Sequence, residues 1–323
     1  MNWCVEEGIG EHRAIRLNGA TIAEARIDWP GSLAAGQIED AVLISKAAGS
    51  ERGTARFASG EETLVDKLPR SACEGGTLRL IITRAAMQET GRRKLAQSRP
   101  SDKAPRPAPT LADNLRSEGH EVQIARRFPD CDWDELWSEA FSGEVAFAGG
   151  SLQIFDTPAM TLIDVDGSGN PASLANAAAM AIATSLARFD LGGSIGIDFP
   201  TIHSKQDRKQ IDAILTAALR DWPHERTAIN GFGFAQIVAR LSRAPITRRL
   251  AVNRTGACAR RLLRQAERVD EPGILQLHCH RAITAQISPA WLEELARRTG
   301  REVRIMEDSS LALEGGFAQA VPL

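Results

Sequence analysis

The chain has 323 residues, of which 43% are hydrophobic and 25% charged, so it can bury a substantial core. Its 39 basic and 41 acidic residues give a net charge of −2, which excludes a uniformly polybasic nucleic-acid coat. The basic set is almost all arginine, whose planar fork suits phosphate. No apolar run reaches the roughly 18 residues of a membrane helix. The five scattered cysteines and the acidic start without a signal core predict a cytoplasmic protein with free thiols and no membrane contact.

The first third of the chain reads as β-structure followed by a linker. Residues 12–29 predict a hairpin around Asn18-Gly19. Short strand-like pieces separated by glycine turns predict a small barrel over 36–97, with strands at 37–44, 53–57, 63–68 and 78–83. Four prolines in residues 98–112 then indicate a linker or an exposed loop.

Beyond the linker, the pattern becomes α/β. Apolar residues at helical spacing predict helices at 133–141, 173–189, 204–219, 233–241, 259–268 and 289–299. Apolar runs between them predict strands at 151–155, 160–165, 194–199, 273–287 and 301–306. The region after about residue 250 is expected to form a small α/β unit of its own.

Two apolar strands end in acidic residues, TLIDVDG with Asp164 and Asp166 and GSIGIDFP with Asp198. Such aspartates are costly to bury unless they are paired or bind a cation. The helix between the strands is long enough to bring them side by side, which would gather two or three carboxylates at one edge. This arrangement favours Mg²⁺ and phosphodiester hydrolysis. Ordinary turn and strand-end chemistry is the alternative interpretation.

A second motif overlaps this place. Gly167-x-Gly169-x-x-Ala172 lies between a strand and a helix, as in a dinucleotide-binding fingerprint. Neighbouring carboxylates would repel a pyrophosphate, Pro171 sits within the turn, and no acid ends the next strand. We therefore weigh this match lightly.

Residues 240–268 hold nine arginines and one acid, Glu267, a local charge of +8 in a chain of net −2. Such asymmetry indicates a polyanionic partner. The alternative is a solvated helix face on which the arginine stems pack.

Several stretches together resemble the ribonuclease E/G family. The core of the resemblance is DWDELWSEAFSGEVAFAGGSLQIFDTPAMTLIDVDG (132–167), RFDLGGSIGIDF (188–199) and INGFGFAQIVARLSR (229–243), in the family's order and close to its spacing. NGATIAEARIDW and the stretches of the predicted barrel resemble the family's first strands and S1-type barrel, and the end of the chain resembles its small domain.

The resemblance implies functional residues. Asp164 and Asp198 match the family's magnesium-binding aspartates, with Mn²⁺ as a substitute. Asp166 stands where the family has asparagine, and we expect it to be the third catalytic carboxylate. Phe57 falls at the barrel's base-stacking aromatic, although it could equally be a core residue, and the second aromatic is Leu64 here. Candidate RNA-binding arginines are Arg240, Arg243, Arg248 and Arg249.

The chain also departs from the family. The region of the 5′-monophosphate sensor is nearly all missing, and so is the zinc-linking cysteine motif, so we expect no structural zinc. His278 and His280, with Cys258, are more often structural than a metal site.

These observations predict an α+β or α/β protein. Its expected parts are N-terminal strands from an RNase H-like subdomain (1–35), an S1-like barrel (36–97), a proline-rich linker with the rest of that subdomain (98–127), a DNase I-like catalytic core (128–250) and a small C-terminal domain (251–323). The expected function is Mg²⁺-dependent cleavage of single-stranded RNA without 5′ sensing. The alternative is an inactive RNA-binding protein of the same fold, and a homodimer stays open.

Overall fold

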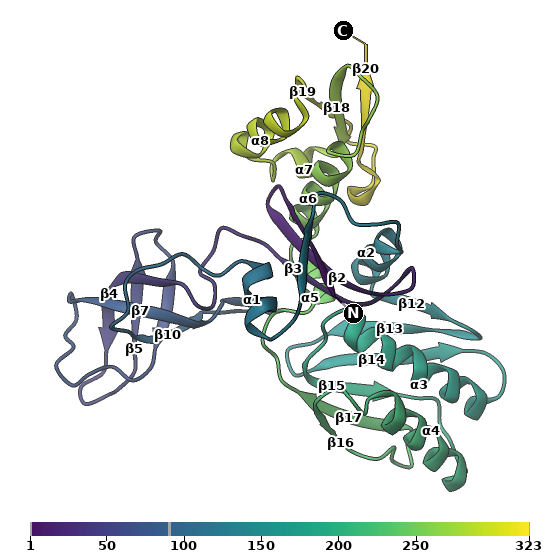
Figure 1. Cartoon of the computed structure of the whole chain (residues 1–323). Coiled ribbons are helices and arrows are strands. Elements are labelled where there is room, and N and C mark those ends of the chain that lie inside the picture. Colours follow the sequence, from purple (N-terminus) through teal and green to yellow (C-terminus); the bar gives the residue numbers. More distant parts are fainter. Residues whose placement is uncertain (1, 90–91, 323) are drawn as a thin grey trace.

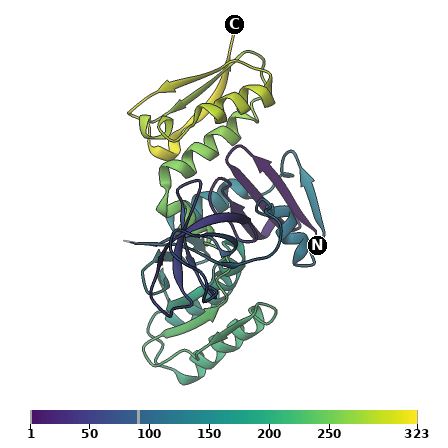
Figure 2. The same ribbon diagram turned by 90° about the vertical axis from the view of Figure 1, so that its left-hand side faces the viewer.

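The computed structural model describes residues 2–89 and 92–322, to which all structural statements below refer. These residues form a mixed α+β structure with one closed five-stranded barrel and four further sheets. Figure 1 shows the barrel on one side, a large sheet with its helices on the other, and a small C-terminal unit at the far end. Figure 2 turns the molecule so that the barrel faces the viewer.

The N-terminal sheet combines the start of the chain with a segment beyond the barrel. Its strands are β1 (Trp3–Gly8), β2 (Glu11–Asn18), β3 (Thr21–Asp28) and β11 (Val122–Ala125), in the order β11-β1-β2-β3. The predicted hairpin is confirmed, because Asn18 pairs with Thr21 across the turn. The helix α1 (Leu111–Ser117) packs Leu111 and Leu115 against Trp3 and Val5.

The predicted barrel is confirmed. Its strands are β4 (Ile38–Lys46), β5 (Gly53–Phe57), β6 (Glu62–Val65), β7 (Thr77–Arg84) and β10 (Ala96–Pro100), in the closed order β10-β6-β5-β4-β7. Alternate side chains fill its interior, which forms a core separate from that of the rest of the chain. A short hairpin of β8 (Met87–Glu89) and β9 (Arg92–Lys94) precedes the last strand.

The large sheet has six strands in the order β12-β13-β14-β15-β17-β16. These are β12 (Glu144–Phe147), β13 (Gly150–Asp156), β14 (Thr161–Gly167), β15 (Gly193–Asp198), β16 (His224–Arg226) and β17 (Phe234–Ala239). The helices α2 (Trp133–Ser142), α3 (Pro171–Arg188) and α4 (Lys205–Ala218) accompany it. The pair β14 and β15 is parallel and is joined by α3, as the sequence predicts.

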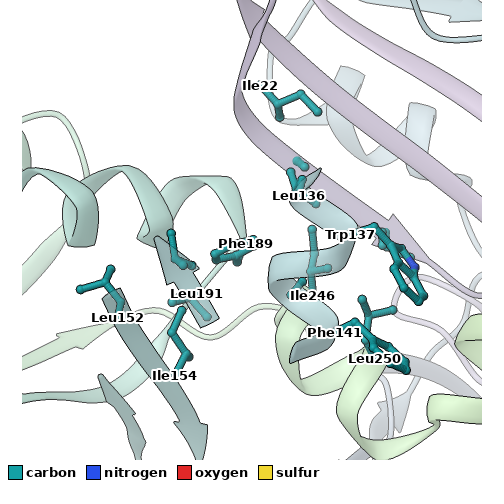
Figure 3. Close-up of a cluster of buried hydrophobic side chains, with 14 of the residues drawn as sticks. Ile22, Leu136, Trp137, Phe141, Leu152, Ile154, Phe189, Leu191, Ile246 and Leu250 are labelled. Carbon is teal, nitrogen blue, oxygen red and sulfur yellow. The ribbon is translucent and has the colours of Figure 1, made fainter. Parts of the chain in front are cut away.

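One face of this sheet is buried in the main core. Leu152 and Ile154 of β13 lie near Phe189 and Leu191, and α2 adds Trp137 to the same cluster (Figure 3). The N-terminus of α3 is stabilised by the Asn170 side chain, which caps the helix, and by Pro171 in its first turn.

The helix predicted over 233–241 is wrong, because β17 occupies these residues. Ala235 and Ile237 are buried whereas Val238 is half exposed, which is the two-residue period of a strand. Only six residues form the element, so the apolar run alone could not distinguish a strand from a helix.

The C-terminal part begins with α5 (Ile246–Val252) and α6 (Arg254–Ala266). It continues with β18 (Ile274–Cys279), α7 (Arg281–Thr284), α8 (Pro289–Thr299), β19 (Val303–Glu307), a 3₁₀ turn (Leu313–Gly315) and β20 (Phe317–Val321). The strand predicted over 273–287 is too long, because His280 ends it by capping α7. The described residues contain no helix that is long and apolar enough to cross a membrane.

A buried ion-pair network fastens the N-terminal sheet to α6. The side chain of Glu6, only 2% exposed, accepts hydrogen bonds from Arg13 and from Arg264. Burial lowers the pKa of Arg13 to about 10. A Cβ on Gly8 would lie 1.8 Å from Arg264 Nη2, so glycine leaves the space that the guanidinium fills.

Candidate metal centre and nucleic-acid interface

The second face of the large sheet carries polar side chains among apolar ones. On β14 and β15, Ile163 and Ile197 are fully buried, whereas the alternate residues Asp164 and Asp198 have solvent access. The same face holds the polar or acidic residues Glu144, Ser151, Gln153, Ser194 and Gln236, together with the apolar residues Phe155, Leu162, Phe234 and Val238. The helices therefore anchor one face and leave the other free to meet a ligand.

The two aspartates predicted as metal ligands are brought together. Asp164, in the middle of β14, lies directly opposite Asp198, the last residue of β15, and the two form the last pair of the parallel register. Neighbouring strands are about 4.8 Å apart, so both carboxylates can reach one ion. Among the described residues neither carboxylate group makes a hydrogen bond or an ion pair, so both are available to a ligand.

Two more side chains extend this pair into a row across the sheet. Gln153 of β13 lies opposite Asp164, and Phe234 of β17 lies opposite Asp198. Gly196, two residues before Asp198, leaves room for the Phe234 ring, because a Cβ there would lie 2.7 Å from the ring. An amide and an aromatic ring therefore flank the carboxylates.

Asp166 lies outside this row. It is exposed, pairs with Ser151 at the start of β13, and its Oδ1 accepts a hydrogen bond from the Gly167 amide at 2.8 Å. The described residues contain no group of three His, Cys, Asp or Glu side chains that could hold a metal ion. The structure thus assembles two carboxylates, and Asp166 is not gathered with them into a three-residue cluster.

The donor set still fits Mg²⁺. This ion keeps several waters and is usually bound through one or two carboxylates together with substrate phosphates. Two carboxylates without side-chain partners on neighbouring strands, both with solvent access, match that requirement. They match zinc poorly, since a structural zinc site has four protein ligands with sulfur or nitrogen donors.

The glycine motif after β14 does not form an anion cradle. The Asn170 Oδ1 accepts hydrogen bonds from Ala172 N at 3.0 Å and Ser173 N at 3.1 Å. A pyrophosphate would need such amides at the start of α3. The backbone amides that a dinucleotide would need are therefore already occupied by Asn170.

Two of the candidate arginines lie at the wrong end of the sheet. Ala239 of β17 pairs with Gly193, so Arg240 follows β17 at the edge opposite Asp198, about 17 Å away along β15. Arg240 is exposed, and Arg243 forms ion pairs with Glu118 and Asp190. The structure does not bring either arginine to the carboxylate pair.

The other two are structural. Arg248, 7% exposed, is bound by both carboxylate oxygens of Asp156, and Arg249 packs over Trp29 with its Nε buried. Burial lowers the pKa of Arg249 below its usual value. The structure does not support the expectation that Arg248 and Arg249 clamp RNA, because Arg248 is paired with Asp156 and Arg249 is packed on Trp29.

Other arginines of residues 240–268 are also engaged in contacts within the fold. Arg260 lies between Trp29 and Trp291, with its guanidinium carbon 4.1 and 4.8 Å from the ring centroids. Arg261 lies over Trp137, and Arg264 pairs with Glu6. The local charge of +8 therefore largely reflects internal stacking and pairing.

Phe57 is a core residue of the barrel. It is 3% exposed and packs among Leu43, Val65 and Leu80. Its proposed role as a base-stacking surface is wrong, because neither ring face is open. Leu64, at the other candidate position, is 43% exposed but has no aromatic ring.

The histidines of the C-terminal unit have structural partners. His278 stacks on Phe317 with ring centroids 4.6 Å apart, and His280 Nδ1 accepts a hydrogen bond from Ala282 N. Burial raises the pKa of the Cys258 thiol to about 11, which disfavours the thiolate that a metal requires. The residues that the structure describes thus support the structural interpretation.

One residue beside the carboxylates was not foreseen. Phe232 lies in the turn before β17 and is 85% exposed, the most exposed of the large hydrophobic residues described. The sequence signal was the tripeptide Gly231-Phe232-Gly233, in which two glycines leave the ring without flanking side chains.

Comparison with known proteins supports the resemblance seen in the sequence. The sequence model of the Ribonuclease E/G family matches residues 101–239. The matched region extends from the segment after the barrel to the end of β17 and includes both aspartates. No curated protein matches the chain.

Proposed function

We propose that this chain, whose residues 101–239 belong to the ribonuclease E/G family, is an endoribonuclease that cleaves single-stranded RNA with Mg²⁺. The observation that carries the proposal is the pair Asp164–Asp198, two carboxylates without side-chain partners that lie opposite each other on the neighbouring central strands β14 and β15. Membership of the family supports ribonuclease activity in general, and the carboxylate pair supports its dependence on a divalent metal.

In this proposal Asp164 and Asp198 hold the ion, for which Mn²⁺ can substitute. A bound Mg²⁺ would supply Lewis acidity, lower the pKa of water and neutralise charge on the phosphate. The role of the protein is to position the two carboxylates. The paired strands hold them in a fixed register, and the buried opposite face of the sheet keeps these strands from moving. Gln153 can donate from its amide to the substrate beside Asp164.

The remaining parts have proposed roles as well. We assign the barrel as S1-like and the six-stranded sheet with its helices as the DNase I-like catalytic core. Between the end of β10 and the start of α2, the structure has only α1 and β11 as regular elements. This short segment supports cleavage without selection for a 5′-monophosphate.

The test compares wild type with Asp164→Asn and Asp198→Asn on a labelled single-stranded RNA. Loss of an outer-shell partner of a metal typically costs about 10- to 100-fold, so loss of a ligand should cost at least 100-fold. Asp221→Asn, which makes the same charge change at an exposed residue beyond α4, is the matched control and should cleave normally. Cleavage should stop in EDTA and return with Mg²⁺ or Mn²⁺.

Three outcomes would contradict parts of the proposal. Wild type that binds RNA without cutting it would establish the inactive RNA-binding alternative. Full activity of both aspartate variants would remove the carboxylate pair from the chemistry. A strong preference for 5′-monophosphate over 5′-triphosphate RNA would refute the loss of 5′ sensing.

A further inference from the structure

The turn that carries Phe232 is held rigidly. The Asn230 Oδ1 accepts hydrogen bonds from Phe232 N at 2.9 Å and Phe234 N at 3.1 Å, and Asn230 N donates to Phe234 O at 3.0 Å. Gly233 has φ +91°, in the region that favours glycine, and its amide donates to Asn230 O at 3.2 Å. The exposed ring is therefore displayed on a fixed backbone.

The turn is also fastened to the strand that carries Asp198. Phe199 N donates to Gly233 O at 3.1 Å, and a Cβ on Gly233 would lie 2.4 Å from Phe199 O. Because Phe234 lies opposite Asp198, Phe232 is two residues along the chain from the carboxylate row. Phe232 thus stands at the same edge as the metal ligands.

The space around the turn is open. A Cβ added to Gly231 would meet no atom within 4 Å. The neighbouring ring of Phe234 is held over Gly196 beside Met160, which leaves Phe232 as the ring that projects freely from this edge. An aromatic ring held in water forgoes the stabilisation of burial, so its fixed display requires an explanation.

Stacking of a nucleic-acid base on the ring would explain why Phe232 is exposed on a fixed backbone. Single-stranded nucleic acids are bound by aromatic side chains on which successive bases stack, whatever their sequence. In the barrel Phe57 is buried and Leu64 has no ring, so neither of the expected barrel positions supplies such a surface. We propose that Phe232 is the stacking surface for a base close to the scissile phosphate, which positions the strand over Asp164 and Asp198. This inference rests on the proposed function, since it needs RNA at this edge.

The experiment measures stacking without cleavage. Single-stranded RNAs that carry one 2-aminopurine at successive positions are titrated with the full chain in EDTA, and both fluorescence quenching and affinity are recorded. Wild type should quench the probe strongly at one or two positions. Phe232→Ala should lose that quenching and bind about 5- to 150-fold more weakly, the range for one stacked base. Phe232→Trp should keep both.

Phe317→Ala is the matched control, because Phe317 is a 43% exposed phenylalanine of the C-terminal unit, on β20. It should behave as wild type. If Phe232→Ala binds and quenches as wild type does, the inference is overturned while the proposed function stands. If wild type itself binds no RNA, both fail. Thermal melts that coincide with wild type exclude unfolding as the cause, and if Phe232→Ala does melt early, the Phe232→Leu variant replaces it.

Discussion

The ion-pair network around Glu6 leads to a sharp prediction about stability. Glu6 is the carboxylate to which both Arg13 and Arg264 donate, and all three side chains are at most 7% exposed. The variant Glu6→Gln keeps the volume but removes the nearest carboxylate from two buried guanidinium groups, which keep only the longer pairs of Arg13 with Glu11 at 3.9 Å and of Arg264 with Glu267 at 3.7 Å. Removing one partner of a buried ion pair typically costs 3–5 kcal/mol, so we expect a loss of about that size in the free energy of unfolding.

Urea denaturation followed by tryptophan fluorescence measures this loss, since Trp133 lies against the Arg13 guanidinium. Asp66→Asn, which removes an exposed pair with Arg52, is the control and should cost at most about 1 kcal/mol. Adding Arg264→Met to Glu6→Gln should recover part of the loss. The reasoning is refuted if Glu6→Gln costs no more than the control, or if the double variant is the less stable of the two.

Three further predictions concern other parts of the molecule. The buried thiol of Cys258, with its pKa near 11, should stay unmodified by a thiol reagent at pH 8, while the exposed Cys73 reacts; equal rates would contradict this. Burial raises the pKa of Asp190 above its unfolded value of about 3.9, so ionisation disfavours the fold. The stability gained by Asp190→Asn should therefore be absent below that pH and should grow as the pH rises, in urea titrations; a pH-independent difference would count against it. Gly8→Ala should push the Arg264 guanidinium from its place and cost about 1–3 kcal/mol in the same assay, and a neutral result would show that the site relaxes freely.

Local chemistry accounts for what the sequence could predict of the fold. Asn18-Gly19 specifies a hairpin through its own backbone preferences, and Pro171 marks the start of α3 in the same way. By contrast, β17 is six residues of an apolar run without a distinctive border, and its identity as a strand comes from pairing with β15. Tertiary pairing of this kind is not written in a local pattern.

The candidate site, like the fold, could be predicted from the sequence only in part. The pair of Asp164 and Asp198 could be predicted, because a carboxylate that follows an apolar run indicates the place where a buried strand reaches solvent. The role of the arginines could not, because their partners lie far away in sequence: Arg264 binds Glu6, and Arg260 donates to Gly10 O at 2.7 Å. A count of charges records the cations of a segment but not the acids and rings that the fold brings to them.

Phe57 and Phe232 also show that the exposure of a side chain could not be predicted from the sequence, since one is buried and the other exposed. Both are phenylalanines near turns in β-structure, and one is 3% exposed whereas the other is 85% exposed. Composition and spacing do not decide which way a ring points on a strand end. The surrounding backbone, with Asn230 holding the turn, decides it for Phe232.

The barrel is connected to the rest of the chain by two tethers, residues 29–37 after β3 and residues 101–110 before α1. Both segments are held against the barrel: Leu33 of the first lies in the barrel core, and the backbone of Arg106 in the second exchanges two hydrogen bonds with Ile38 of β4. These contacts keep the barrel close to the rest of the chain. An RNA strand held by the barrel would then meet the carboxylate edge at an effective concentration in the millimolar range, so a weak hold on each part would suffice for a firm hold on the whole strand.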